Sequence, residues 1–241
     1  MVLNYIEESN VGLVRDHNED YVKVFRLDTG LLCIVCDGLG GNNAGEVASE
    51  TAAYAMYDYF KFYKNIPPVQ RIIDSLEFAN REILELSKRH RAYNGMATTG
   101  VMLYLEAGTA YYGHIGDSRL YYFYDDELLQ LTKDHSLVQR MVDQGLIKMD
   151  DAEKHPYKNV ITQALGDTEE IKPDVASFLL PQNGNWKFLI CTDGVSNLME
   201  AEEMAELMVR RNLDRIADSI GQTVEERGAH DNYSFIIISN E

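Results

Sequence analysis

Residues 31–38, with the sequence LLCIVCDG, and residues 186–194, with the sequence WKFLICTDG, share one pattern although they lie far apart in the chain. Each is an apolar run of the kind found in buried β-strands, and each ends in Asp-Gly. Because glycine lets the backbone turn sharply, each aspartate is expected at the tip of its strand. The two runs therefore predict two central strands, each with a carboxylate at one end.

Groups of strands and helices surround these runs. Residues 21–26 and 31–36 predict a β-hairpin around the turn at residues 28–30, DTG. An apolar stripe at three- and four-residue spacing from Ala44 onward predicts a helix that Pro67-Pro68 ends. A second amphipathic helix begins with Pro68 near its first turn. We expect these two helices to pack as a pair.

The second half of the chain predicts more strands and a second group of helices. Alternating apolar residues predict a four-stranded antiparallel meander, with strands at residues 98–105, 110–115, 120–124 and 128–132. A strand, two amphipathic helices and a last strand are predicted at residues 186–192, 201–210, 213–227 and 233–238. Strand groups interleaved with helix pairs predict an α+β fold, in which two antiparallel sheets pack together with helices outside.

Composition limits the class of protein. The chain has 241 residues, 45% hydrophobic and 25% charged, and no Pro-, Ser- or Gly-rich linker divides it, so we expect one domain over residues 1–241. Twenty-two basic against thirty-nine acidic residues give a net charge of −17, which argues against nucleic acid and membrane partners. No run approaches the roughly 20 apolar residues of a membrane span, and no secretion signal is evident. We therefore expect a cytoplasmic protein.

The cysteines Cys33, Cys36 and Cys191 all lie in apolar runs. Their odd number and setting favour reduced core thiols over a disulfide framework. Cys33 and Cys36 have C-x-x-C spacing, but residues three apart on a strand point to opposite faces of the sheet. A redox pair or a zinc site at these two residues is therefore not expected.

Further acidic residues lie beside the ends of other predicted strands, at Glu19, Asp20, Asp117 and Asp231. In an antiparallel sheet, the end of one strand lies beside the start of its neighbour. These carboxylates can therefore converge with Asp37 and Asp193 on one rim of the fold. A single Asp-Gly is ordinarily a turn, so the interpretation depends on the joint pattern.

Converging carboxylates repel one another and lose hydration unless a cation neutralises them. An oxygen-only ligand set favours Mg²⁺ or Mn²⁺ over zinc or copper. Two such ions about 3.5–4 Å apart, bridged by one carboxylate, can lower the pKa of a shared water and supply hydroxide near neutral pH. This is the chemistry of a metal-dependent hydrolase.

Arg15 is a basic residue in the acidic segment 15–20, RDHNED. Its planar guanidinium could hold a phosphoryl group through two hydrogen bonds beside the metal ions. The alternative is a solvated arginine paired with Asp16 or Glu19. Gly40-Gly41 belongs to neither known glycine-rich phosphate motif, so we assign it a bending role.

Seven short motifs follow one another along nearly the whole chain: RDHNED 15–20, DGLGG 37–41, GMATT 95–99, GDSR 116–119, LTKDHS 131–136, TDG 192–194 and DN 231–232. With these motifs in this order, the chain resembles the metal-dependent protein phosphatases of the PPM, or PP2C, type, especially their compact bacterial members. The resemblance implies a four-layer α/β/β/α sandwich of two antiparallel sheets flanked by helix pairs. It also implies that the metal ions lie in a cleft at one end of the sheets.

The resemblance implies roles for the residues of the core metal site. Asp37 would bridge two Mn²⁺ or Mg²⁺ ions. Asp193 and Asp231 would complete the ligands of one ion, and Glu19 with the Gly38 carbonyl would serve the other. These implied roles agree with the carboxylate pattern described above.

Other positions receive roles from the same resemblance. Asp20 would act through metal-bound water, Asp117 together with Asp193 would hold a weaker third ion, and Arg15 would bind phosphate. The region around residues 146–166 resembles the family's mobile flap beside the cleft. The alternative for that region is a plain surface connection, which length alone does not exclude.

Several positions depart from the family's pattern. Leu39 replaces a histidine that is proposed as the general acid in animal-type enzymes, and Asn42 falls where many bacterial members have histidine. Gln163 replaces a common flap arginine, and Ala229 replaces a glycine before Asp231. Protonation of the leaving group is therefore unassigned, and substrate contacts are expected to differ from those of relatives.

The activity implied by the resemblance is metal-dependent hydrolysis of phosphoserine and phosphothreonine in proteins, opposing Ser/Thr kinases. A monomer acting on phosphorylated protein substrates is expected. Two alternatives use the same site. One is a catalytically silent, metal-stabilised module that binds phosphoproteins, against which the intact ligand set and Arg15 argue. The other is a phosphatase for small metabolites.

Overall fold

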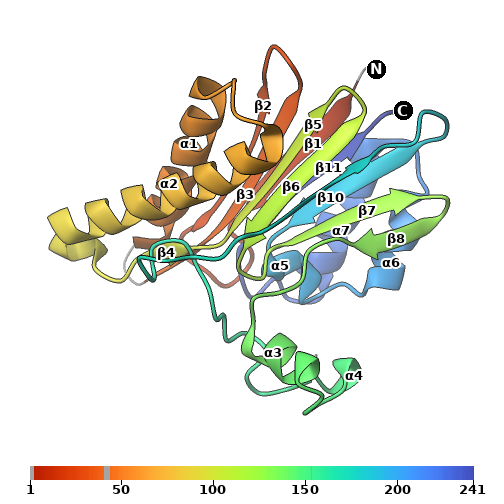
Figure 1. Ribbon diagram of the computed structural model, residues 1–241. Helices are drawn as coiled ribbons and strands as arrows, with labels where there is room; N and C mark the ends of the chain where they lie inside the picture. Colours follow the sequence, from red (N-terminus) through yellow and green to blue (C-terminus); the bar gives the residue numbers. More distant parts are fainter. Residues whose placement is uncertain (1–2, 41–43, 153) are drawn as a thin grey trace.

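The computed structural model describes residues 3–40, 44–152 and 154–241. Two positions discussed above lie outside these residues. They are Gly41, which with Gly40 was assigned a bending role, and Asn42, which departs from the family's pattern. Two antiparallel β-sheets pack face to face, and helices cover both outer surfaces (Figure 1). This is the four-layer α+β sandwich that the sequence predicted.

The first sheet has five strands, in the order β1 (Asn4–Asn10), β11 (Tyr233–Ser239), β10 (Trp186–Cys191), β7 (Arg119–Tyr124) and β8 (Glu127–Gln130). The second sheet has the order β2 (Asp20–Arg26), β3 (Leu31–Leu39), β5 (Gly100–Glu106), β6 (Thr109–Ile115) and β9 (Asp174–Leu179), with β4 (Ala97–Thr98) paired to β3. Neighbouring strands in both sheets are antiparallel. The predicted hairpin is formed by β2 and β3.

Helices cover the outer faces of both sheets. The second sheet is covered by α1 (Ala44–Phe62) and α2 (Pro68–Arg89), and the first by α5 (Asp193–Ser196), α6 (Ala201–Met208) and α7 (Leu213–Glu226). A short 3₁₀ helix follows α2 at Arg91–Tyr93. Two further helices, α3 (Leu137–Asp143) and α4 (Met149–Ala152), lie in a segment that projects from one end of the sandwich (Figure 1).

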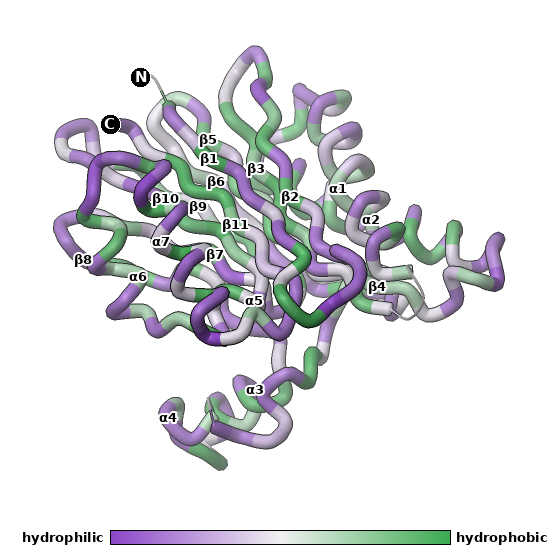
Figure 2. Tube along the Cα trace, turned by 180° about the vertical axis from the view of Figure 1, so that it is seen from behind, coloured by the Kyte–Doolittle hydropathy of each residue, from purple (hydrophilic) through white to green (hydrophobic). Residues whose placement is uncertain are grey.

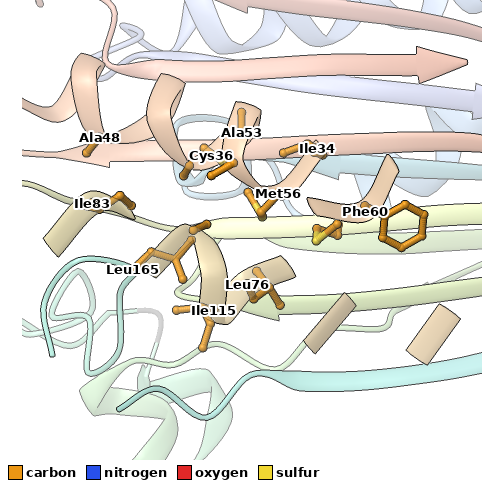
Figure 3. Packing of buried hydrophobic residues seen from close by; sticks show 14 of the residues in the cluster. Ile34, Cys36, Ala48, Ala53, Met56, Phe60, Leu76, Ile83, Ile115 and Leu165 are labelled. Atoms are coloured by element: carbon orange, nitrogen blue, oxygen red, sulfur yellow. The ribbon is translucent and has the colours of Figure 1, made fainter. Parts of the chain in front are cut away.

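Three apolar layers hold the four structural layers together. Alternation along β3 shows how one strand contributes to two of them. Cys33 and Val35 face the other sheet, whereas Ile34 and Cys36 face α1 and α2. Figure 3 shows the layer under the helices, where Met56 and other α1 residues meet the sheet. All three cysteines are buried free thiols, as predicted.

The predicted meander is wrong in one respect: its strands belong to two sheets. β6 pairs with β5 and β9, whereas β7 pairs with β8 and β10. The chain crosses between the sheets at residues 116–118. Gly116 has a φ of +102°, and a Cβ there would lie 2.6 Å from Cγ2 of Thr99. This glycine turn delivers Asp117 to the end of the sandwich.

Strands β1 and β9 were not expected from the sequence. Both are edge strands, and most of their residues are exposed or half-buried. They therefore lack the apolar alternation by which a half-buried strand is recognised. Figure 2 shows that hydrophobic residues concentrate on the more central strands and that turns are mostly hydrophilic. Within the described part of the chain, no helix has the length and apolarity to cross a bilayer.

Candidate active site

Strand pairing brings the first predicted carboxylates together. Asp20 at the start of β2 lies directly opposite Asp37 near the end of β3. Thr192, which follows β10 in the other sheet, donates a hydrogen bond from Oγ1 to Oδ2 of Asp20 over 2.9 Å. This bond joins the two sheets at one end of the sandwich. Asp193, the next residue, is consequently close enough for its charge to act on both Asp20 and Asp37.

Asp231 and Asp117 complete the group. Asp231 precedes β11, the neighbour of β10, and its charge acts on Asp193 and Asp20. Asp117 lies in the crossover between the sheets, and its charge acts on Asp37. The fold thus gathers all five predicted aspartates, which are separated by up to 211 residues of sequence, at one end of the sheets.

Burial, followed by repulsion from neighbouring carboxylates, dominates the electrostatics of four of the aspartates. Burial raises the pKa of Asp20 to about 7; nearby carboxylates add to this rise, and hydrogen bonds such as that from Thr192 oppose it. Burial and the charge of Asp193 likewise raise the pKa of Asp117 to about 7. The pKa of Asp37 and that of Asp193 are also raised, again first by burial. At neutral pH, the ionised group therefore needs a positive partner.

Glu19 and Gly38 lie side by side next to this group. The N–H of Gly38 donates to the carbonyl oxygen of Glu19 over 3.1 Å. A Cβ on Gly38 would lie 2.3 Å from the carbonyl oxygen of Gly45 and 2.4 Å from that of Glu19, so no larger residue fits. The Glu19 carboxylate lies against Gly45 at the start of α1, and its pKa is raised by burial. The structure brings together the pair predicted for the second ion.

The donor set fits a hard divalent cation. Every predicted ligand offers oxygen, which Mg²⁺ and Mn²⁺ prefer. In addition, Oδ1 of Asp117 is buried and has no hydrogen-bond partner in the described structure. A buried acceptor left alone costs free energy, whereas a cation would satisfy it.

The carboxylate oxygens lie near one another but are not as closely spaced as the ligands of a bound cation. In the part of the chain that the structure describes, one group of three or more His, Cys, Asp or Glu side chains has all its ligand atoms within 4.8 Å of one another. That group is His114, His135 and Asp174, and it contains none of the five aspartates. Oxygens that share one Mg²⁺ at 2.0–2.1 Å can be at most about 4.2 Å apart. Cation binding would therefore draw the aspartates inward.

Arg15 contacts the same group. Its Nη2 lies 2.9 Å from Oδ2 of Asp231, and both side chains are about half exposed, at 48% and 42%. The structure pairs Arg15 with Asp231 and not with Asp16 or Glu19, the two partners considered from the sequence. The guanidinium is therefore at the rim of the carboxylate group, where an incoming anion would meet it.

Three polar residues in the quoted motifs have structural roles that the sequence analysis did not assign. Thr99 accepts the N–H of Asp37 at Oγ1 over 2.9 Å and bonds Oγ of Ser118 over 2.7 Å, so it links the backbones beside Asp37 and Asp117. Asn232 accepts the N–H of Glu19 and donates to the carbonyl oxygens of residues 11 and 17. It thereby fixes the segment that carries Arg15. The third of these residues is Thr192, which donates the hydrogen bond to Asp20 described above.

A cavity of about 420 Å³ opens beside Asp117 and Asp193. It lies between α5–α6 and the projecting segment that carries α3 and α4, within which the predicted flap falls. Lys154 and Lys158 line it from the projecting segment, and Glu202 lines it from α6. Gln163, at the position of the family's flap arginine, instead accepts the N–H of Lys172 over 3.3 Å.

Comparison with known proteins identifies the family of the chain. The family model of protein phosphatase 2C matches residues 14–229. The chain belongs to the protein phosphatase 2C family. A serine/threonine phosphatase, stp, of Listeria monocytogenes is 34% identical over 236 residues, covering 95% of this chain and 93% of that protein.

Solved structures of family members have the same fold. The Mycobacterium tuberculosis serine/threonine phosphatase PstP/Ppp superposes with a TM-score of 0.90 at 29% identity, covering 100% of both chains. The catalytic domain of PstP in complex with two manganese ions superposes with a TM-score of 0.84 at 28% identity, covering 98% of this chain and 97% of that one. The fold and the family predicted from the motifs are therefore confirmed.

Proposed function

We propose that this protein is a Mn²⁺- or Mg²⁺-dependent phosphatase that hydrolyses phosphoserine and phosphothreonine in proteins and so opposes Ser/Thr kinases. The observation that carries the proposal is the group of four buried or half-buried aspartates, gathered at the end of both sheets, whose pKa values are raised by burial and by neighbouring carboxylates. Relatives named serine/threonine phosphatase, and a similar solved structure in complex with two manganese ions, support it.

The proposed ligands follow the family's pattern. Asp37 would serve two cations, together with Asp193 and Asp231 for one and with Glu19 and the Gly38 carbonyl for the other. Asp20 would support the site through bound water, and Asp117 with Asp193 would hold a weaker third cation. Bound cations would supply a water activated for attack on phosphorus and would neutralise charge on the phosphoryl oxygens.

The side chains of the protein position the phosphoryl group and neutralise its charge. Arg15 leaves Asp231 and takes the phosphoryl oxygens through its planar N–H groups. Thr192 and Asn232 hold Asp20 and the Arg15 segment in place through the hydrogen bonds described above. Little covalent chemistry is asked of side chains in phosphoryl transfer, so positioning and charge account for most of the rate.

The wider setting follows from the sequence. We propose that residues 1–241 form one catalytic domain with a flap at about 146–166, that the protein acts as a monomer in the cytoplasm, and that its substrates are phosphoproteins of a Ser/Thr kinase. The cavity between the projecting segment and α6 is large enough to bind residues of a protein substrate that flank its phosphorylated residue.

The test is hydrolysis of a phosphothreonine peptide during a Mn²⁺ titration, with and without chelator. Saturable turnover that chelator abolishes is the expected result. Cation and peptide binding without product would instead identify the silent module. Faster turnover of nucleotides or sugar phosphates than of phosphopeptides would identify a metabolite phosphatase.

A further inference from the structure

His114, His135 and Asp174 form a compact group at the base of the projecting segment. Their ligand atoms lie within 4.8 Å of one another, and the two imidazole rings stack with centroids 4.6 Å apart. His114 is buried on β6, and Asp174 begins β9. By residue type alone, the group could bind a transition metal.

The hydrogen bonds of His135 occupy both of its ring nitrogens. The backbone N–H of Gly116 donates to Nδ1 of His135 over 3.2 Å, so a neutral His135 carries its proton on Nε2. That Nε2 lies 3.3 Å from Oδ2 of Asp174, to which it donates. A protonated nitrogen has no lone pair for a metal. The contacts with Gly116 and Asp174 therefore hold the His135 ring in one tautomer and one orientation.

His135 holds Gly116 from both sides. Besides accepting the Gly116 N–H at its ring, it donates its own backbone N–H to the Gly116 carbonyl over 2.9 Å. Gly116 has positive φ and directly precedes Asp117, whose Oδ1 is buried without a partner. The position of this carboxylate therefore depends on a turn that His135 fixes.

The same residue is bound to the projecting segment. The carbonyl oxygen of His135 accepts the N–H of Thr162 over 2.7 Å. Next to it, Ser136 forms a β-bridge with Ile161, and Leu137 donates its N–H to Val160 over 2.8 Å. The two strands of chain at the neck of the segment are thus hydrogen-bonded to each other at residues 135–137, beginning at the same His135 that contacts Gly116.

We infer that His135 is a positioning residue that couples the projecting segment to the weaker cation site at Asp117. The inference rests on the proposed function, because it assigns the regulation of that site. Through His135, movement of the neck shifts Gly116 and with it the Asp117 carboxylate. By linkage, a cation at Asp117 then favours the neck arrangement described here.

Two substitutions separate the contacts of the ring. His135→Asn places an amide oxygen near the position of Nδ1 and so retains an acceptor for Gly116, but it does not reach Asp174. His135→Gln reaches the position of Nε2 and loses the acceptor for Gly116. Asp174→Asn retains an acceptor for the ring and serves as a control. Mn²⁺ binding would be measured by calorimetry and electron paramagnetic resonance, and thermal midpoints would be recorded for every variant.

The expected result is selective. His135→Gln weakens the lowest-affinity Mn²⁺ site by about tenfold or more, as loss of a ligand's supporting contacts commonly does, and leaves the tighter sites unchanged. His135→Asn and Asp174→Asn bind Mn²⁺ as the wild type does. Equal losses in both His135 variants would reduce the residue to a packing role and overturn the inference. So would unchanged binding in His135→Gln.

A measurement on the unaltered protein covers the case in which His135→Gln does not fold. In a Mg²⁺ titration followed by nitrogen-proton NMR, the Gly116 amide and the His135 ring should shift together as the weaker site fills, with Nε2 protonated throughout. No shift, or displacement of the ring proton by added Zn²⁺, would overturn the inference. Absence of any Mn²⁺-dependent hydrolysis by the wild type would instead contradict the proposed function.

Discussion

Each aspartate of the site is held differently, so substitutions there should have different effects. Asp20 is buried and bonded to Thr192, whereas Asp231 is partly exposed and paired with Arg15. Asp117 has an oxygen with no partner among the described residues. Asp20 therefore connects the two sheets in the cation-free protein, and Asp117 offers an unpaired oxygen to a cation.

Replacing Asp193 or Asp231 with Ala should abolish phosphatase activity, by about 100-fold or more, and reduce Mn²⁺ affinity. Each change removes a charged oxygen ligand that no neighbour can replace. Activity on a phosphothreonine peptide and Mn²⁺ calorimetry are the measurements. Asp28→Ala, in the exposed hairpin turn at the opposite end of β2, is the matched control and should change neither. Full turnover by either site variant would refute the assigned ligands.

Arg15→Ala should lower kcat/KM for phosphopeptides by about 10–100-fold, because it removes charge-assisted hydrogen bonds worth roughly 1.5–3 kcal/mol. Mn²⁺ binding should be retained, since Arg15 is not a ligand. Arg26→Ala, at the far end of β2, is the control for loss of a positive charge. An unchanged kcat/KM in Arg15→Ala would remove the phosphate-binding role.

The sequence predicts the acidic residues of the site better than the residues that hold them. Asp37 and Asp193 are recognisable because an apolar run precedes each one and a glycine follows it. Thr99 and Asn232 stand in quoted motifs, but a hydroxyl or an amide has many local partners, and only the tertiary fold selects one. The pairing of Arg15 with Asp231 depends likewise on contact between residues 216 positions apart.

At the scale of the elements, the crossover between β6 and β7 determines where the site lies. Alternating residues predicted both strands correctly, yet alternation specifies which face is buried and not which strand is the neighbour. β6 and β7 both present apolar residues to the space between the sheets, so a single meander fits the same pattern. The edge strands β1 and β9 could not be predicted from alternation because their faces are largely exposed.

Gly116→Ala should destabilise the crossover and weaken the Asp117 site. The φ of +102° strains any residue with a Cβ, by about 1–2 kcal/mol, and the new methyl would also meet Thr99 at 2.6 Å. Gly108→Ala is the matched control, because Gly108 has a φ of +79° but has no other atoms within 4 Å of a built Cβ. Chemical denaturation should show a larger loss for Gly116→Ala than for Gly108→Ala. Equal losses would show that the contact with Thr99 does not matter.

For the whole molecule, the carboxylates of the site and the net charge of −17 both favour the binding of protons or cations. The folded state gathers carboxylates whose pKa values are raised, so it binds more protons than the unfolded chain between about pH 4 and pH 7. The stabilising protonation is complete at low pH and is lost as pH rises through about 7. The stability of the cation-free protein should therefore fall over that range.

Thermal denaturation with chelator, and with saturating Mg²⁺, should show this linkage. The Mg²⁺-induced rise in Tm should be larger at pH 7.5 than at pH 5.5, because the cation replaces protons that Asp20 and Asp117 have lost. A difference of 1 kcal/mol corresponds to about 2–4 °C for a chain of this size. Glu203, whose pKa is lowered to about 2, acts outside this window. An equal rise at both pH values would contradict the electrostatic account, and Asp117→Asn should reduce the difference.

An anomalous difference map from crystals grown with Mn²⁺ tests the proposed cation site most directly. Folding is proposed to gather oxygens of Asp37, Asp193 and Asp231 around neighbouring divalent cations. Two strong peaks about 3.5–4 Å apart are expected, with Asp37 between them and the other aspartates drawn inward. Peaks elsewhere, or no peak among these three side chains at saturating Mn²⁺, would contradict it.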